Sequence, residues 1–289
     1  MLFDPDRCRS LLFVPAGNER YLQSALRGEA DVIQVDLEDA ISPDQKDVAR
    51  EAAISAVELI HAAGRVGAVR VNSESALLSD DLAAVVGPHL SALTTPKVES
   101  GESLMRLDEV VSNLERERGI PIGQIRLIAQ IESASGVLNA RGIASSTSRL
   151  AAMGIGMEDL AADVGSVVNA ATLQFPNTQV LYAAREADVT PIGYPGSITV
   201  YNEPDTFREW IRSAKMQGFE GGFCIHPSQI EILNQEMRHS DSEVEEASAI
   251  IDTLEDHPGE GAFSHEGRMV DAPVIVRARR VLRRNELFT

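Results

Sequence analysis

The sequence predicts an α/β protein built as a (β/α)8 TIM barrel with a C-terminal helical tail or lid. Eight short apolar runs alternate with stretches of helical period, which is the pattern of parallel β/α winding. The runs extend from residue 10 to residue 227, close to the roughly 250 residues that such a barrel needs. The alternative is an open Rossmann-type sheet, but the turn after the first run, PAGNER, lacks the G-x-G-x-x-G pattern of that fold.

The eight apolar runs are the expected strands, at residues 10–16, 32–38, 67–72, 93–98, 126–132, 149–156, 189–195 and 221–227. Helical spacing lies between them, as in Phe207, Trp210, Ile211 and Ala214 before the last run. Ser42 is typical of a helix N-cap, because Pro43 follows it and Gln45 stands at the capping-box position. We expect a barrel domain over 1–240 and a C-terminal tail or lid over 241–289.

Composition narrows the class of protein. The formal net charge of −18 disfavours nucleic acid and anionic membranes as partners. No apolar run approaches the roughly 18 residues of a membrane span. The two cysteines, Cys8 and Cys224, are too few for a disulfide framework or a zinc site. The default expectation is therefore a cytoplasmic protein in a reducing compartment.

Charged and amide side chains gather at the carboxyl ends of the expected strands, where barrels place their active sites. They are Asp36, Glu38, Asp39, Arg70, Asn72, Lys97, Glu99, Gln130, Glu132, Glu158 and Asp159. Carboxylates that share one face raise each other's pKa unless a cation neutralises them. Oxygen ligands suit Mg²⁺, with Mn²⁺ as the alternative ion. We expect Glu132 and Asp159 to hold this ion.

Several of these residues have a second interpretation. Asp159 and Ser133 are also typical helix caps. Arg70 is placed to clamp a substrate oxygen or to pair with an acid of the neighbouring strand. Lys97 either neutralises the acids or forms a Schiff base. His226 precedes a Pro-Ser turn, which favours a structural role. The arginine-rich helix near the C-terminus is a solvated face, a subunit contact or a phosphate site.

Read together, the segments resemble the citrate lyase β-subunit family of the HpcH/HpaI aldolase superfamily, which includes malyl-CoA and citramalyl-CoA lyases. The matching segments span nearly the whole chain and lie at 9–20, 31–50, 69–72, 96–100, 131–144, 154–165, 217–230 and 267–282. The resemblance implies a barrel that assembles as a homotrimer or hexamer and uses Mg²⁺ without a Schiff base.

The resemblance also implies a role for each matching residue. Glu132 and Asp159 would hold Mg²⁺. Arg70 would bind the oxygens of the oxoacid half of the substrate, and Glu38 and Asp39 would support metal-bound water.

The remaining implied roles fall on the sixth strand end and the tail. The backbone near Gly156, Met157 and Glu158 would grip the substrate carboxylate. Asp271, for which the residues alone indicate no role, would be the catalytic acid or base, acting on a neighbouring subunit. Two positions depart from the family pattern: Ser24 stands where relatives often carry a lysine, and Gly193 where several lyases carry an acid.

The activity that the resemblance implies is a reversible Claisen-type carbon–carbon lyase. It would act on a 3-hydroxyacyl-CoA ester such as malyl-, citramalyl- or citryl-CoA, giving an acyl-CoA and a 2-oxoacid. The alternatives are a metal-dependent aldolase on free small acids, a thioesterase on the same CoA esters, and a non-catalytic CoA-ester-binding subunit.

Overall fold

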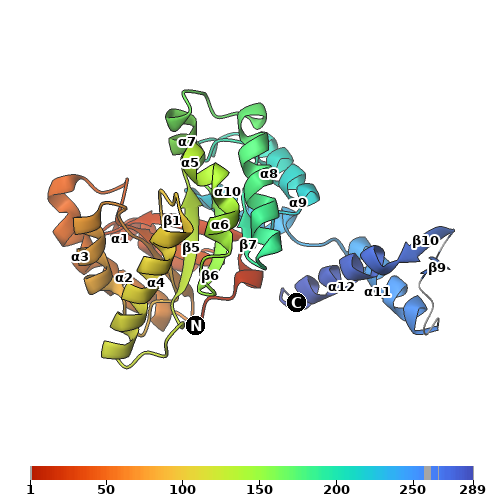
Figure 1. Cartoon of the computed structure of the whole chain (residues 1–289), viewed down its shortest axis with the longest axis horizontal. Coiled ribbons are helices and arrows are strands. Elements are labelled where there is room, and N and C mark those ends of the chain that lie inside the picture. Colours follow the sequence, from red (N-terminus) through yellow and green to blue (C-terminus); the bar gives the residue numbers. More distant parts are fainter. Residues whose placement is uncertain (1, 257–261, 266, 289) are drawn as a thin grey trace. The chain divides into compact units, whose positions relative to one another are not determined.

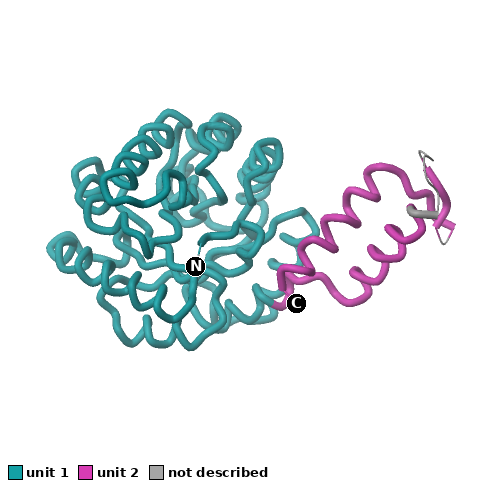
Figure 2. Tube along the Cα trace, turned by 90° about the horizontal axis from the view of Figure 1, so that it is seen from below, with its two compact units in different colours: residues 1–234 teal, residues 235–289 magenta. Residues whose placement is uncertain are grey.

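The computed structural model describes residues 2–256, 262–265 and 267–288. The chain forms two compact units, Met1–Asn234 and Gln235–Thr289, which are coloured separately in Figure 2. The first unit contains the eight-stranded sheet. The second contains two helices and a two-stranded antiparallel sheet (Figure 1).

Eight parallel strands form the barrel of the first unit. They are β1 (Ser10–Pro15), β2 (Val32–Asp36), β3 (Val66–Arg70), β4 (Ala92–Thr95), β5 (Arg126–Ile131), β6 (Leu150–Ile155), β7 (Thr190–Ile192) and β8 (Gly222–Cys224). Each strand from β1 to β6 pairs with the next along the chain, and β1 also pairs with β8. A parallel bridge between Ile192 and Gly221 joins β7 to β8 and closes the ring. The predicted (β/α)8 barrel is confirmed.

Helices connect the strands on the outside of the ring (Figure 1). They are α1 (Glu19–Arg27), α2 (Lys46–Ala62), α3 (Ser75–Val85), α4 (Gly101–Glu117), α5 (Ala134–Leu138), α6 (Ala140–Ala144), α7 (Met157–Asp163), α8 (Ala170–Glu186), α9 (Pro204–Gln217) and α10 (Pro227–Glu236), with short 3-10 turns at η1 (Pro5–Arg7) and η2 (Pro43–Gln45). Ser42 precedes the turn η2 and makes no side-chain cap bond, so the expected helix start there is corrected: α2 begins at Lys46.

The barrel interior changes character along its axis. Small and aliphatic side chains fill the amino half, in a buried cluster that includes Leu11, Val32, Ala68, Ala92, Ile128, Ala152 and Ile192. One step of the strand alternation further on, the buried side chains become polar: Gln34, Thr94 and Gln130. Asp36 and Arg70 follow on neighbouring strands, where they are register partners. Strand alternation therefore carries polar groups to the carboxyl end of the ring.

The last two strands are shorter than the sequence predicts. The run at 189–195 contributes only Thr190–Ile192, and the run at 221–227 only Gly222–Cys224. Pro195 ends the seventh run and Gly196 follows it, and Pro227 begins α10. The chain between β7 and α9 consequently leaves the sheet as a loop.

The second unit has its own small core. Helix α11 (Asp241–Asp256) packs on α12 (Ala272–Glu286), and β9 (Ala262–His265) pairs antiparallel with β10 (Arg268–Asp271). Its buried residues are Ala247, Ile250, Phe263, Val270 and Ala278. Asp271 is the residue at which β10 ends and α12 begins.

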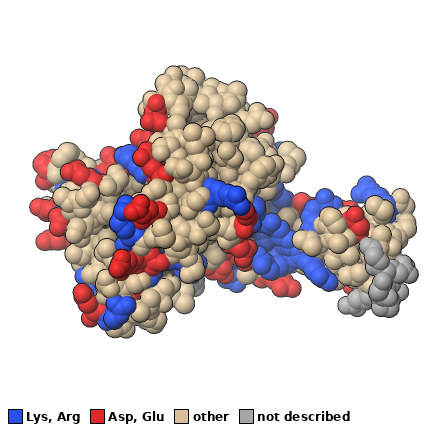
Figure 3. Space-filling view, viewed as in Figure 1, with Lys and Arg blue, Asp and Glu red and all other residues tan. Residues whose placement is uncertain are grey.

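Two global properties follow from the side chains. Acidic residues are spread over the visible face of the first unit, in keeping with the net charge of −18 (Figure 3). Among the described residues, none of the helices combines the length and apolarity needed to traverse a bilayer.

Candidate active site

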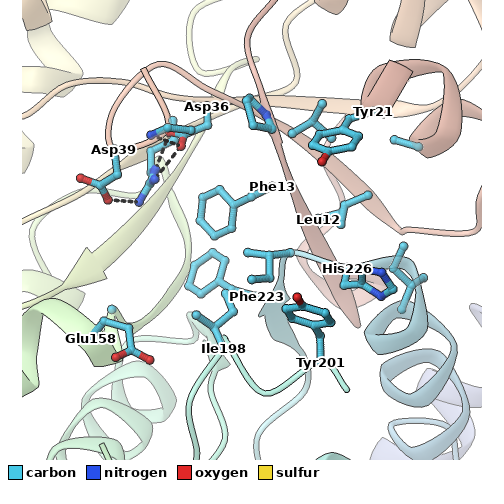
Figure 4. Close-up of a pocket in the computed structure, with 18 of the residues that line it drawn as sticks. Leu12, Phe13, Tyr21, Asp36, Asp39, Glu158, Ile198, Tyr201, Phe223 and His226 are labelled. Carbon is cyan, nitrogen blue, oxygen red and sulfur yellow. Dashed lines mark hydrogen bonds and ion pairs between the residues drawn. The ribbon is translucent and has the colours of Figure 1, made fainter. Parts of the chain in front are cut away.

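A cavity of about 880 Å³ opens at the carboxyl end of the barrel, and the strand-end residues line it (Figure 4). Its polar lining includes Asp36, Asp39, Arg70, Gln130, Glu132, Glu158 and Asp159. Its apolar and aromatic lining includes Leu12, Phe13, Tyr21, Ile198, Tyr201, Phe223 and Ile230. The cavity is therefore amphipathic, with the expected acid cluster forming part of its wall.

Arg70 is fixed by acids of the neighbouring strand end. Its Nε donates to Oδ1 of Asp36 and its Nη2 donates to Oδ2, each at 2.7 Å. Its Nη1 lies 3.2 Å from Glu38 and 3.1 Å from Asp39. Burial disfavours the charged guanidinium, but these contacts outweigh it and raise the pKa of Arg70. Arg70 is thus a permanent cation with a fixed orientation, and its guanidinium carbon lies 4.5 Å from the ring centre of Phe13.

Glu38 and Lys97 form a second ion pair beside Arg70. The Lys97 ammonium lies 2.8 Å from Glu38. Burial lowers the pKa of Lys97, but the contact with Glu38 more than compensates and raises it. For Glu38 burial raises the pKa, and the contacts with Lys97 and Arg70 only partly offset this. Lys97 is therefore protonated and engaged with an acid, which argues against its acting as a Schiff-base amine.

Glu132 is the most perturbed acid of the cluster. Its side chain is 4% exposed, and its Oε2 accepts a hydrogen bond of 3.1 Å from the backbone N–H of Lys97. Burial raises its pKa, the charges of Glu38 and Asp159 raise it further, and Arg70 and Lys97 counteract only in part, so that the pKa reaches about 8. The charge of Asp159 is therefore close enough to act on Glu132. Two carboxylates that share one metal ion must lie close to each other in this way.

Gly156 allows this arrangement by its lack of a side chain. A Cβ at this position would lie 2.4 Å from both Cγ and Oε1 of Glu132. Gly156 is the N-cap of α7, and Glu158 and Asp159 follow in its first turn. Asp159 itself is not the cap, so that alternative interpretation is wrong, whereas Ser133 does cap α5 through a bond from the N–H of Gly136.

The donor set fits a hard divalent cation. Within the described residues, no group of three or more His, Cys, Asp or Glu side chains is arranged to enclose a metal. Mg²⁺ needs only one or two carboxylates, with water or substrate oxygens in its other positions. Glu132 and Asp159 could supply such a pair, and a cation would relieve the repulsion between them. Gln130, which lines the same cavity, has a buried Oε1 without a hydrogen-bond donor in the described structure.

A buried lysine, Lys46, holds the backbone next to the acid cluster. The sequence did not predict this role. The Lys46 ammonium donates to the carbonyl oxygens of Leu37 and Glu38 and to Oδ1 of Asn72, each at 2.7 Å. Asn72 donates in turn to Asp81 from its side chain and its backbone. Lys46 therefore fixes the backbone that carries Glu38. The available signal was a lysine at the start of an amphipathic helix, which predicts a solvated residue.

Other expected residues lie in different settings. His226 lines the cavity, but its Nδ1 contacts Ser228 Oγ at 2.8 Å and its ring stacks on Tyr201, which is the expected turn role. Ser24 lines the cavity on α1. Asp271 belongs to the second unit, is half-buried, and makes no side-chain cap bond to α12.

Gly193 is a packing residue of the barrel. A Cβ there would lie 3.1 Å from Oδ1 of Asn177 and 3.1 Å from the Phe219 ring. An acid at this position would require both neighbours to move.

Comparisons with known proteins show the family to which the chain belongs. The family model described as HpcH/HpaI aldolase/citrate lyase matches residues 9–227. The citrate lyase subunit beta of Leuconostoc mesenteroides subsp. cremoris is 31% identical over 95% of this chain and 92% of that protein. In Cereibacter sphaeroides, an L-malyl-CoA/beta-methylmalyl-CoA lyase is 28% identical over 99% and 96% of the two chains. A (3S)-malyl-CoA thioesterase of the same organism is 31% identical over 96% and 94%.

A solved structure is similar over nearly the whole chain. Protein CitE from Mycobacterium tuberculosis, in complex with magnesium, acetoacetate and coenzyme A, has a TM-score of 0.75 at 27% identity. The match covers 98% of this chain and 100% of that one. These findings confirm the expected family and, with it, a lyase. The chain belongs to the HpcH/HpaI aldolase/citrate lyase family.

Proposed function

We propose that this protein is a Mg²⁺-dependent carbon–carbon lyase that cleaves or forms a 3-hydroxyacyl-CoA ester of the malyl, citramalyl or citryl type. The products of cleavage are an acyl-CoA and a 2-oxoacid. The observation that carries the proposal is the environment of Glu132, a buried acid whose pKa is raised to about 8 beside Asp159 and Glu38. The relatives that act on malyl-CoA and the neighbour bound to magnesium and coenzyme A support it.

Glu132 and Asp159 would hold the ion. When bound, Mg²⁺ would supply a Lewis acid and a template for the oxygens of the hydroxyacid half. The neighbouring Gly156, Met157 and Glu158 begin α7, where we propose that backbone N–H groups bind the substrate carboxylate.

Arg70 would orient and polarise the substrate oxygen that becomes the carbonyl of the oxoacid. Its two bonds to Asp36 fix the guanidinium before the substrate arrives, so that no reorganisation is needed as charge develops. Glu38, held by Lys97, and Asp39 would accept hydrogen bonds from the water beside the substrate.

The bond changes in the cleaving direction can be assigned. The substrate hydroxyl would pass its proton to the water held by Glu38 and Asp39. The carbon–carbon bond would then break, and its electron pair would pass to the α-carbon of the acyl-CoA. That carbon then takes a proton, for which Asp271 is the proposed acid, contributed by a neighbouring subunit of a homotrimer or hexamer. In the synthetic direction the same group would remove this proton.

The second candidate is a thioesterase on the same CoA esters, favoured by the 31% identity to the (3S)-malyl-CoA thioesterase. The two reactions differ in their products. A lyase yields an acyl-CoA and a 2-oxoacid, whereas a thioesterase yields free CoA and the intact hydroxyacid.

The test is a panel of malyl-, citramalyl-, β-methylmalyl- and citryl-CoA with Mg²⁺, with products identified by mass. The proposal predicts an acyl-CoA and a 2-oxoacid from at least one ester. Glu132→Gln is expected to lower turnover by at least about a thousandfold, because it removes a ligand charge. Glu99→Gln is the control, since Glu99 is exposed and contacts Ser133 outside the cavity. Free CoA with intact hydroxyacid, or wild-type turnover in Glu132→Gln, would contradict the proposal.

A further inference from the structure

Three apolar side chains from separate parts of the chain form one wall of the cavity. Phe13 comes from β1, Phe223 from β8 and Ile198 from the loop between β7 and α9. We call Phe13, Ile198 and Phe223 the apolar wall. In Figure 4 they lie near the centre of the view, with Asp39 and Glu158 to one side and Tyr21, Tyr201 and His226 to the other.

The apolar wall adjoins the charged part of the site. The ring of Phe13 lies 4.5 Å from the Arg70 guanidinium carbon, and the rings of Phe13 and Phe223 are 5.5 Å apart. Phe223 is 2% exposed, and Phe13 and Ile198 pack against the core cluster to which it belongs. A small acid bound at Arg70 would therefore lie next to the Phe13 end of this wall.

Ile198 is held in place by contacts of its loop. Gln229 Nε2 donates to the carbonyl oxygen of Ile198 at 2.9 Å, and Ser228 Oγ donates to that of Tyr201 at 3.1 Å. Ser197 donates to the carboxylate of Glu158. Three anchors on two different elements thus fix the loop, so that the wall is a preformed surface.

The charges around the wall are unfavourable for an additional carboxylate. Among the described residues that line the cavity, acids outnumber the arginines, which are Arg20 and Arg70. Arg70 already contacts three carboxylates. Arg20 belongs to α1, whose residue Tyr21 lies across the cavity from Asp39 in Figure 4. The arginine beside the wall, Arg70, is thus already neutralised, so a second carboxylate against the wall would lose water without gaining a cation of its own.

We propose that the apolar wall makes the site selective for monocarboxylic 2-oxoacids with a short alkyl substituent, of the pyruvate type. It would disfavour dicarboxylic ones of the oxaloacetate type, because their second carboxylate would be desolvated against Phe13, Ile198 and Phe223. This inference rests on the proposed function and narrows it, since it favours the citramalyl type of ester over the citryl type.

The first test measures binding without catalysis. The full-length protein with saturating Mg²⁺ is titrated calorimetrically with pyruvate, 2-oxobutyrate and freshly dissolved oxaloacetate. The inference predicts that both monocarboxylates bind at least about tenfold more tightly than oxaloacetate, as expected for a burial penalty of this kind. Equal or tighter binding of oxaloacetate would overturn it. If no 2-oxoacid binds in the presence of Mg²⁺, the proposed function itself fails instead.

The second test reverses the preference. Ile198→Arg places a cation on the wall and is expected to shift the ratio of the two dissociation constants, oxaloacetate to pyruvate, by at least about tenfold towards oxaloacetate. Val110→Arg is the control, because Val110 is exposed on α4 and does not line the cavity. An unchanged ratio in Ile198→Arg, with pyruvate still bound, would contradict a selecting role for the wall.

Discussion

Two clusters of charged residues at opposite ends of the barrel differ in their ratio of acidic to basic side chains. At the carboxyl end, Arg70 and Lys97 face a larger set of acids that includes Asp36, Glu38, Asp39 and Glu132. At the amino end, Arg149, which directly precedes β6, contacts Asp108 at 2.6 Å and Glu115 at 2.8 Å.

Burial acts to raise the pKa of Glu132 at one end and of Glu115 at the other, but hydrogen-bond donors decide the outcome. Glu115 accepts bonds from two nitrogens of Arg149 and from the backbone of Gly123 and Ile125, and together they lower its pKa despite burial. Glu132 accepts one bond from the backbone of Lys97, and its pKa rises. A structural cluster satisfies its charges internally, whereas the cavity cluster has an excess of negative charge that suits an added cation.

The largest expected effect on stability is at the amino end. Arg149→Met leaves Glu115 buried without its cation, so the free energy of unfolding should fall by about 3–5 kcal/mol. Urea denaturation measures this, with Arg106→Met as control, since the exposed Arg106–Glu102 pair is worth less than about 1 kcal/mol. Turnover by the folded fraction should be unchanged. A loss of stability no larger than that of the control would show that the amino-end cluster is not structural.

A smaller effect is expected from pH. Because the pKa of Glu115 is lowered from 4.5 in the folded state, its contribution to stability is fully present above pH 4.5. The contribution is lost as the pH falls through the lowered pKa, where the unfolded chain binds more protons than the folded one. Denaturation curves between about pH 3 and 6 should show this loss in the wild type and a flatter dependence in Glu115→Gln. Parallel curves for the two proteins would argue against it.

The barrel was predictable because it depends on local pattern. Apolar runs alternating with helical spacing specify the strands, and strand ends on one face specify the acid cluster. The sequence did not decide whether Arg70 binds substrate or pairs with an acid of the neighbouring strand. The register that places Asp36 beside Arg70 depends on how the two strands pair. The structure shows the pairing with Asp36 and also places Arg70 in the cavity wall.

Other features depend on contacts between distant segments and were not predictable. Lys46 reaches two carbonyl oxygens and Asn72, although its helical context predicts solvent exposure. The apolar wall needs Ile198, which lies in the loop after β7, beyond the run at 189–195 where the sequence predicts a strand. Asp271 had no role from residue pattern alone, because its local sequence only predicts a helix start.

We propose that the acids of the cavity hold a divalent ion, which a crystal structure of the protein with Mg²⁺ and pyruvate would reveal. We predict one oxygen of Glu132 and one of Asp159 at about 2.1 Å from the ion, with pyruvate and water oxygens in the other positions. An ion bound elsewhere, or a cavity occupied by pyruvate with neither carboxylate on a metal, would contradict the account.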